Sequence, residues 1–105
     1  MLEIVPLEKS PTKAEVKAII DHLVKTDKIS WTKHSKARMN ERDIAIPEVI
    51  NCLQKGVVMD EPYQIHDHGG GYRVTLEKRT AGRHLRVVAT LKYTQRILVI
   101  TAIWV

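Results

Sequence analysis

The sequence contains one cysteine, Cys52, so no disulfide bond can form within the chain. Cys52 lies in an apolar helical pattern, which favours a buried, unreactive thiol over a nucleophile. No segment has the basic and then apolar pattern of an export signal. No apolar run reaches the length of about 18 residues that a membrane-spanning helix needs. These absences predict a cytoplasmic protein that does not enter a membrane.

Several common catalytic sequence patterns are also missing. The chain has no glycine-rich phosphate loop between a strand and a helix, no Gly-x-Ser-x-Gly turn and no Cys-x-x-Cys pair. Residues 62–105 contain only two carboxylates, Asp67 and Glu77, which are too few for a hydrolase that works with a carboxylate pair. We therefore set these schemes aside and expect no cofactor.

The length of 105 residues and a hydrophobic content of 44% fit a single domain over residues 1–105. The net charge of +5 is unevenly distributed. Residues 1–61 hold ten basic and ten acidic residues, whereas residues 62–105 hold seven basic residues against two acidic ones. A basic C-terminal part favours binding to polyanions such as RNA, although the same positive charge is also a common way to keep a sheet soluble.

Apolar residues recur at helical spacing in the first half of the chain. The pattern predicts a helix over residues 11–26, a second helix from Lys33 to about Asp43, and a third over residues 46–55 that ends at Gly56. Asp43 is expected to adopt the left-handed turn that glycine usually supplies. Residues 28–32 could be an edge strand or an extended entry to the second helix.

After Gly56 the apolar pattern alternates, which predicts strands. The predicted strands are residues 57–61, 72–80, 83–93 and 96–105, with a loop over residues 62–71. In the last strand, alternation places Leu98, Ile100 and Trp104 on one face and Ile97, Val99 and Ile103 on the other. The fold class is therefore α+β, with N-terminal helices packed on a roughly four-stranded antiparallel sheet.

His34, Arg38 and Arg42 recur every four residues, so a helix places them on one face. This row could bind a phosphate, or it could be a solvated face. The arginines could also pair with Glu41, Asp43 or Glu48 and brace the helices. Two further arginines, Arg73 and Arg86, lie on strand faces opposite the apolar stripes. If the two groups face each other, they enclose a basic cleft that an anion would stabilise.

The same residues suit RNA cleavage without a metal. That reaction needs a base for the 2′-hydroxyl proton, an acid for the departing 5′-oxygen and cations for the phosphorane. Histidine can serve either proton role at neutral pH. The predicted catalytic residues are His34, Arg38 and Arg86, with His84 and Tyr93 in reserve. The predicted nucleic-acid-binding residues are Arg42, Arg73, Arg83, His84 and Lys92.

His66 and His68 are two residues apart and could share a metal ion. They lie in a glycine-rich segment, and no third ligand follows at a clear spacing. A mobile polar loop is the alternative, and the sequence predicts no metal site.

The ordered motifs from His34 to Ile44, Val49 to Leu53, Gly56 to Val58, Gly82 to Ala89 and Ile97 to Thr101 resemble domain-of-unknown-function family 4258. The resemblance covers about residues 28–105 and leaves residues 1–27 as an N-terminal helical extension. The family is similar to the BrnT and RelE-like toxins of bacterial toxin–antitoxin modules.

The resemblance implies a RelE/barnase-like fold, cleavage of messenger RNA that is often ribosome-bound, and neutralisation by a small antitoxin. It places the family's helix-starting histidine and following arginine at His34 and Arg38. The family usually has a second histidine in a later strand, where this chain has Arg86. It also usually has glycine where this chain has Asp43.

Two other functions fit the same sequence. A nucleic-acid-binding module without catalysis would use the same basic surface and need no proton transfer. A protein-interaction domain would use an exposed sheet edge, and the apolar segment from Ile97 to Val105 could also form a homodimer.

Overall fold

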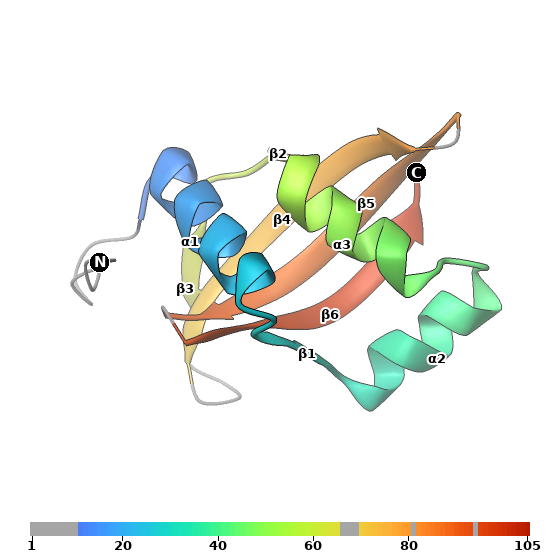
Figure 1. Ribbon diagram of the computed structural model, residues 1–105, viewed down its shortest axis with the longest axis horizontal. Helices are drawn as coiled ribbons and strands as arrows, with labels where there is room; N and C mark the ends of the chain where they lie inside the picture. Colours follow the sequence, from blue (N-terminus) through green and yellow to red (C-terminus); the bar gives the residue numbers. More distant parts are fainter. Residues whose placement is uncertain (1–10, 66–69, 81, 94) are drawn as a thin grey trace.

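The computed structural model describes residues 11–65, 70–80, 82–93 and 95–105. In this part of the chain, three helices and six strands form an α+β fold (Figure 1). The helices are α1 (Lys13–Lys25), α2 (Lys33–Glu41) and α3 (Ile46–Lys55). The strands are β1 (Ile29–Trp31), β2 (Val57–Val58), β3 (Tyr63–Ile65), β4 (Gly71–Thr80), β5 (Arg83–Lys92) and β6 (Arg96–Trp104). The three predicted helices are confirmed, and Asp43 has the expected positive φ of 57°.

The strand order is β1-β6-β5-β4-β2, and β3 also pairs with β4. β1 runs parallel to β6, whereas the other pairs are antiparallel. The prediction of a roughly four-stranded antiparallel sheet was therefore wrong in strand number and in direction. Residues 62–71 contain β3, and the strand predicted over residues 57–61 ends at Val58. β2 has two residues and β3 has three, so their own sequences contain too few residues to show alternation.

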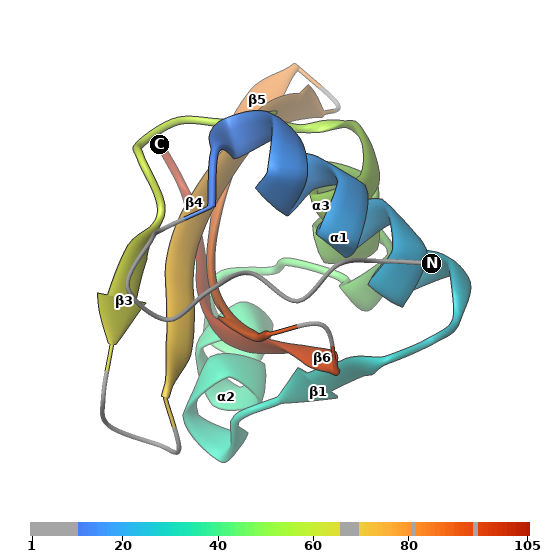
Figure 2. The same ribbon diagram turned by 90° about the vertical axis from the view of Figure 1, so that its left-hand side faces the viewer.

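Helices α1 and α3 lie against one face of the sheet (Figure 2). The inward residues of β5 are fully buried there, as predicted: Leu85, Val87, Ala89 and Leu91. α1 adds four buried residues to the same core: Val16, Ile19, Ile20 and Leu23. Lys17 of α1 also donates hydrogen bonds to the carbonyl oxygens of Leu53, at 2.9 Å, and Gln54 at the end of α3. Segment 1–27 therefore contributes a layer of the domain through α1.

A register shift in β6 changes which of its side chains face the core. Val88 pairs with Thr101 while Ala89 pairs with Val99, so Ile100 has no partner on β5. Beyond this bulge, Trp104 lies opposite the core residue Leu85, and Ile103 lies opposite Arg86. The simple alternation predicted for this strand was therefore wrong from Ile100 onward, because one extra residue exchanges the two faces.

Helix α2 lies beside β6, on the side away from β5 (Figure 1). β1 pairs with β6 only over Ile97–Val99, so beyond Val99 the edge of β6 away from β5 has no neighbouring strand among the described residues. The Arg42 side chain donates a hydrogen bond of 2.9 Å to the Ala102 carbonyl oxygen, and Trp104 Nε1 donates one of 2.9 Å to the Arg42 carbonyl oxygen. The end of α2 thus satisfies polar groups at a sheet edge that would otherwise be open.

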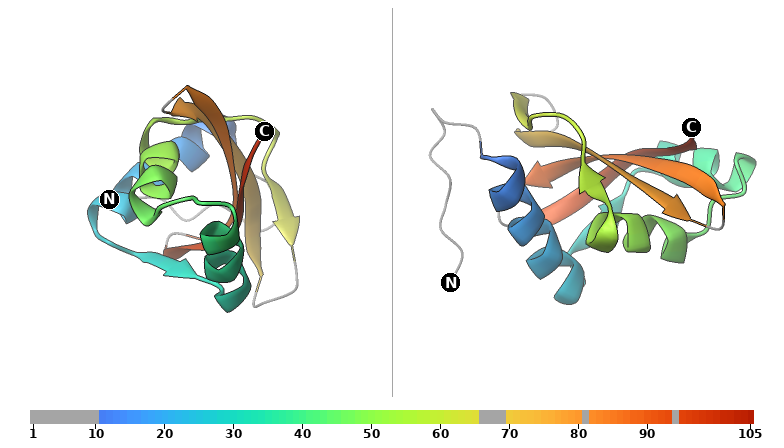
Figure 3. Two further views of the ribbon diagram at one scale, coloured as in Figure 1. Left: turned by 90° about the vertical axis from the view of Figure 1, so that its right-hand side faces the viewer. Right: turned by 90° about the horizontal axis from the view of Figure 1, so that it is seen from above.

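The other face of the sheet carries no helix in the described part of the chain (Figure 3). β4 and β5 present polar and charged side chains on this open face, including Thr75, Glu77, His84 and Arg86. None of the described helices is long and apolar enough to cross a membrane.

Candidate functional site

The helix row begins directly after the N-cap of α2, where the Thr32 hydroxyl accepts a hydrogen bond of 2.9 Å from the Ser35 amide. His34 and Arg38 are exposed, and Arg38 Nε lies 3.4 Å from His34 Nε2. Arg38 also forms an ion pair of 3.0 Å with Glu41. This pairing confirms one alternative considered for Arg38. An exposed pair within one helix contributes little to stability, so it leaves Arg38 available to a stronger anion.

Arg42, the third member of the row, contacts the sheet. Its Nη1 donates hydrogen bonds to Thr101 Oγ1 at 3.2 Å and to the Ala102 carbonyl oxygen at 2.9 Å. Thr101 is the cross-strand partner of Val88 on β5. Arg42 therefore contacts β6, which is one strand, or about 4.8 Å, away from β5 at the centre of the open face.

A second polar group lies on the open face. Glu77 of β4 accepts a hydrogen bond of 2.7 Å from Arg86 Nε through one carboxylate oxygen. Its other carboxylate oxygen lies 2.6 Å from His84 Nε2. The side chains are exposed to different extents: 11% for Glu77, 39% for His84 and 44% for Arg86. Glu77 is thus largely covered, while the histidine and the arginine reach solvent.

Glu77 was not among the residues predicted from sequence, although a signal for it exists. In the hairpin register Thr80 lies opposite Arg83, and counting back along β4 places Glu77 opposite Arg86. His84 is then a diagonal neighbour of Glu77 on the same face. The turn register could have identified this group before the structure was known.

The Arg86 hydrogen bond, followed by that of His84, holds the pKa of Glu77 below its usual value. Glu77 therefore stays anionic at neutral pH and is a weak base. An anionic carboxylate accepts from both neighbours, so it fixes the orientation of the Arg86 guanidinium and the His84 imidazole. Because His84 Nε2 faces a carboxylate, Nε2 carries the ring proton and donates it to Glu77. In the neutral imidazole, Nδ1 is then the nitrogen that can accept a proton.

The remaining predicted cations each have a local partner. Arg73 Nε donates to Thr90 Oγ1 at 3.2 Å, and Lys92 Nζ donates to the Gly70 carbonyl oxygen at 3.2 Å. The Arg83 guanidinium lies 4.0 Å from the centre of the Trp104 ring, in a cation–π contact. Tyr93, the other reserve candidate, has a φ of 55° and packs edge-on against Tyr72.

The sequence left open whether the five cations face one another across a cleft, and the structure gives each of them contacts with other groups. No hydrogen bond or ion pair among the described residues joins the α2 row to Arg73 or Arg86. His34 and Arg38 contact each other, Arg42 binds β6, and Arg86 binds Glu77. The basic residues therefore form separate groups. His34, Arg38 and Glu41 on α2 combine an imidazole, a guanidinium and a carboxylate, as do His84, Arg86 and Glu77 on the sheet. The sheet group differs because its carboxylate is largely buried and contacts both the imidazole and the guanidinium, whereas the Glu41 carboxylate is exposed and contacts Arg38.

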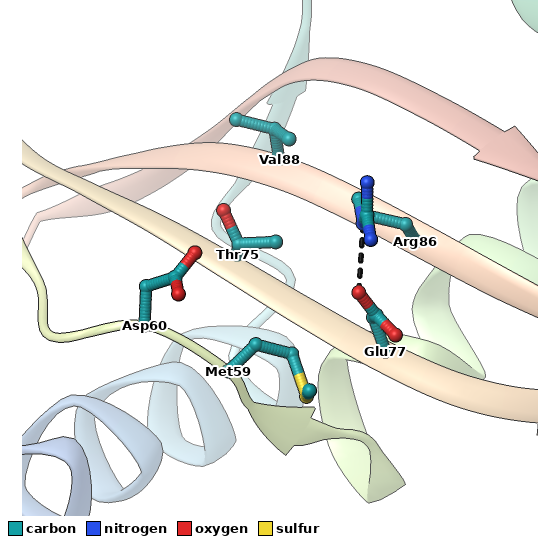
Figure 4. A pocket seen from close by; sticks show the side chains of 6 residues that line it. All are labelled: Met59, Asp60, Thr75, Glu77, Arg86 and Val88. Atoms are coloured by element: carbon teal, nitrogen blue, oxygen red, sulfur yellow. Dashed lines mark hydrogen bonds and ion pairs between the residues drawn. The ribbon is translucent and has the colours of Figure 1, made fainter. Parts of the chain in front are cut away.

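A depression of about 390 Å³ lies beside the Glu77–Arg86 pair (Figure 4). Its lining residues come from β4, from β5 and from the connection after β2: Met59, Asp60, Thr75, Glu77, Arg86 and Val88. Arg86 and Glu77 lie at one side of Thr75, and Asp60 lies at the other (Figure 4). The open face thus has a recess with a basic group at one end and a carboxylate at the other.

No cluster of three or more metal-ligating side chains occurs among the described residues. His66 and His68, which were considered as metal ligands, lie outside the described residues. Cys52 is buried, as predicted, and desolvation raises the pKa of its thiol to about 11. A thiol with this pKa is protonated at neutral pH, which agrees with a structural role.

Residues 31–104 match the model of a family described as a domain of unknown function (DUF4258). The chain belongs to this family. The match begins at the end of β1 and includes α2, α3 and strands β2 to β6 of the DUF4258 domain, so α1 lies outside it. Searches among curated proteins and among solved structures found no match. The family description names no activity, so the function of this DUF4258 protein must be inferred from its own residues.

Proposed function

We propose that this DUF4258 protein is a metal-independent endoribonuclease and the toxin component of a bacterial toxin–antitoxin module. The observation that carries the proposal is the group formed by Glu77, His84 and Arg86 beside a recess on the open face of the sheet. These three side chains are of the types that cleave RNA without a metal. The basic C-terminal part of the chain would attract the RNA.

Exposure assigns the roles within this group. His84 and Arg86 reach solvent, so they are the groups that can meet a substrate, whereas the Glu77 side chain is largely buried. In the proposed reaction, His84 Nδ1 takes the proton from the RNA 2′-hydroxyl, and the 2′-oxygen attacks the adjacent phosphorus. The 5′-oxygen leaves and takes a proton from water, which gives a 2′,3′-cyclic phosphate and a 5′-hydroxyl end.

Arg86 stabilises the negative charge that develops on the phosphorane. Its Nε is bound to Glu77, so both terminal nitrogens remain to donate to phosphate oxygens. Glu77 acts as a positioning residue, because it holds the Nε2–H tautomer of His84 and fixes the Arg86 plane. Buried from most of the solvent and kept anionic, it needs no proton transfer of its own.

The toxin role follows from the resemblance to the BrnT and RelE-like proteins. It implies that the RNA is a messenger, free or on the ribosome, and that a small antitoxin protein neutralises the activity in the cytoplasm. The catalytic group proposed here differs from the predicted set of His34, Arg38 and Arg86. His84 takes the proton-transfer role, and Arg86 keeps its role at the phosphate.

A second candidate function is nucleic-acid binding without cleavage. It is favoured by Arg86 itself, which stands where the resembling family usually has a histidine. In this function the basic open face would bind the phosphate backbone, and His84 would only pair with Glu77. Binding would weaken steeply as salt is added.

The test is incubation of purified protein with RNA, with and without EDTA, and analysis of the product ends. The proposal expects cleavage in EDTA, 2′,3′-cyclic phosphate ends, and loss of cleavage in Arg86→Ala but not in Arg96→Ala. Arg96 is the matched control because it is an exposed arginine of the next strand, β6, that donates to Ser30 Oγ instead of Glu77. RNA that stays intact, free and on ribosomes, but binds in a salt-dependent way would replace this proposal with the second candidate.

A further inference from the structure

The recess beside the Glu77 group contains a carboxylate that the catalytic chemistry does not use. Asp60 is exposed and has no hydrogen-bond or ion-pair partner within the described residues. Its backbone segment is nevertheless held in place. The Met59 amide donates a hydrogen bond of 2.9 Å to the Thr75 carbonyl oxygen, and Pro62 is buried.

The walls of the recess suit a flat, partly apolar ligand. Met59 and Val88 provide apolar surface, and Thr75 adds a hydroxyl group between them and Asp60 (Figure 4). The volume of about 390 Å³ lies near the lower end of the range for small-ligand sites. A nucleobase has the required shape, because its faces are apolar enough to lie against a thioether and an aliphatic chain, while its edge forms hydrogen bonds.

The charges in the recess determine how a nucleotide would be oriented. The charge of Glu77 is compensated by Arg86, whereas Asp60 has no cationic partner among the described residues, so a phosphate would be repelled from the Asp60 end. Arg86 and His84 lie at the Glu77 end, where a phosphate would be attracted. Thr75 and Glu77 are two residues apart on β4, about 7 Å, which is comparable with the distance between a base and the phosphate of the same nucleotide.

We infer that the recess is a nucleobase subsite that selects guanine through Asp60. The inference rests on the proposed function, and it names the base next to the cleaved bond. The two oxygens of a carboxylate accept two hydrogen bonds. Guanine presents two adjacent donors, N1–H and the N2 amino group. Adenine, cytosine and uracil present single donors flanked by acceptors, which would face the second carboxylate oxygen and be repelled.

The test is calorimetric binding of the 3′-monophosphates of guanosine, inosine, adenosine, cytidine and uridine to the whole protein. We expect guanosine 3′-monophosphate to bind at least about tenfold more tightly than the adenosine, cytidine and uridine nucleotides, because guanine donates one more hydrogen bond to the charged carboxylate. Inosine lacks the N2 amino group and should bind with intermediate affinity. The preference should disappear in Asp60→Asn.

The matched control is Glu61→Gln, which removes the neighbouring carboxylate. The Glu61 side chain is 80% exposed and does not line the recess, and among the described residues it pairs with Lys13, at 3.9 Å. This variant should keep the guanine preference. Circular dichroism of Asp60→Asn checks that the exposed substitution leaves the fold intact.

The binding assay and the cleavage assay separate the two proposals. Guanine-selective binding that depends on Asp60, without RNA cleavage, would keep the subsite and overturn the endoribonuclease. Cleavage of RNA after all four bases, with equal binding of the nucleotides or none, would keep the endoribonuclease and overturn the subsite. A guanine preference that survives in Asp60→Asn would also overturn the subsite.

Discussion

The helix row of α2 and the Glu77 group of the sheet contain similar residues but differ in what surrounds them. His34 and Arg38 are exposed and contact residues of their own helix. His84 and Arg86 come from the strand next to Glu77 and share its carboxylate across the hairpin. A helix brings together residues three or four apart, whereas a strand pair brings together residues whose order is set by the turn. Regular spacing along one helix therefore does not define a site by itself. In the sheet, the Glu77 carboxylate contacts both the imidazole and the guanidinium and fixes the orientation of both.

The largest effect is expected for His84→Ala. Removing the proton acceptor should lower the rate of RNA cleavage by about 10²–10⁴-fold, the usual range for a general base. The measurement is single-turnover cleavage of an oligonucleotide at saturating protein. The control is His22→Ala, which changes an exposed histidine of α1. Equal loss in both variants would remove the distinction between the sheet group and the rest of the surface.

Glu77→Gln should have the next largest effect, a loss of about 10²-fold, because the amide presents a donor as well as an acceptor to His84 and Arg86. The change should also lower stability at neutral pH. The pKa of Glu77 is lowered by folding, so its contribution is present above the unfolded pKa of about 4.3 and is lost as the pH falls through the folded value.

Urea unfolding of Glu77→Gln and of the parent protein at pH 7 and at pH 3 checks this sign. The stability difference should be clear at pH 7 and smaller at pH 3. Glu41→Gln is the control, since it removes the exposed carboxylate of the α2 row. A stability difference for Glu77→Gln that grows as the pH falls would contradict the pairing of Glu77 with Arg86 and His84.

Arg42→Met should change stability more than cleavage. It removes the hydrogen bonds to Thr101 and Ala102, which should cost about 1–3 kcal/mol, while the apolar stem is largely retained. Cleavage by the folded variant should stay within about threefold of the parent. A large loss of cleavage at unchanged stability would assign Arg42 to the RNA-binding site, as the sequence predicted.

The smallest effect is expected for His34→Ala. His34 is exposed and contacts Arg38, so its loss should change the cleavage rate by less than about twofold. The measurement is the same single-turnover assay used for His84→Ala. A loss as large as that of His84→Ala would reverse the comparison and restore the catalytic role that the sequence predicted for the helix row.

The sequence predicted the long elements well because their periodicity is local. α1, α2, α3 and the strands β4, β5 and β6 each contain enough residues to show a period of 3.6 or 2. The sequence left residues 28–32 open as an edge strand or an extended entry, and the structure makes β1 an edge strand of the sheet. β3 was not predicted, because its three residues are too few to show alternation. The exchange of faces in β6 was not predicted, because the bulge at Ile100 depends on the pairing of β6 with β5.

The candidate site was predicted only in part, because residue types and strand faces follow from the local sequence whereas cross-strand partners do not. Arg86 and His84 were selected by residue type and by their strand face, and the structure places both beside Glu77. Glu77 was counted only as one of few carboxylates, since a partner becomes visible only when the register is considered. Asp60 was treated as part of a strand, and its place in the recess depends on the hydrogen bond that ties Met59 to β4.

The parallel pairing of β1 with β6 has a consequence for synthesis of the protein. β1 cannot pair until residues 97–99 have left the ribosome, because they are its partners. At about 5–20 residues per second, the earlier helices wait several seconds with their apolar faces uncovered. His84 and Arg86 are also made before β6, which flanks their strand. The sheet face that carries His84 and Arg86 is therefore completed only after β6 has been synthesised.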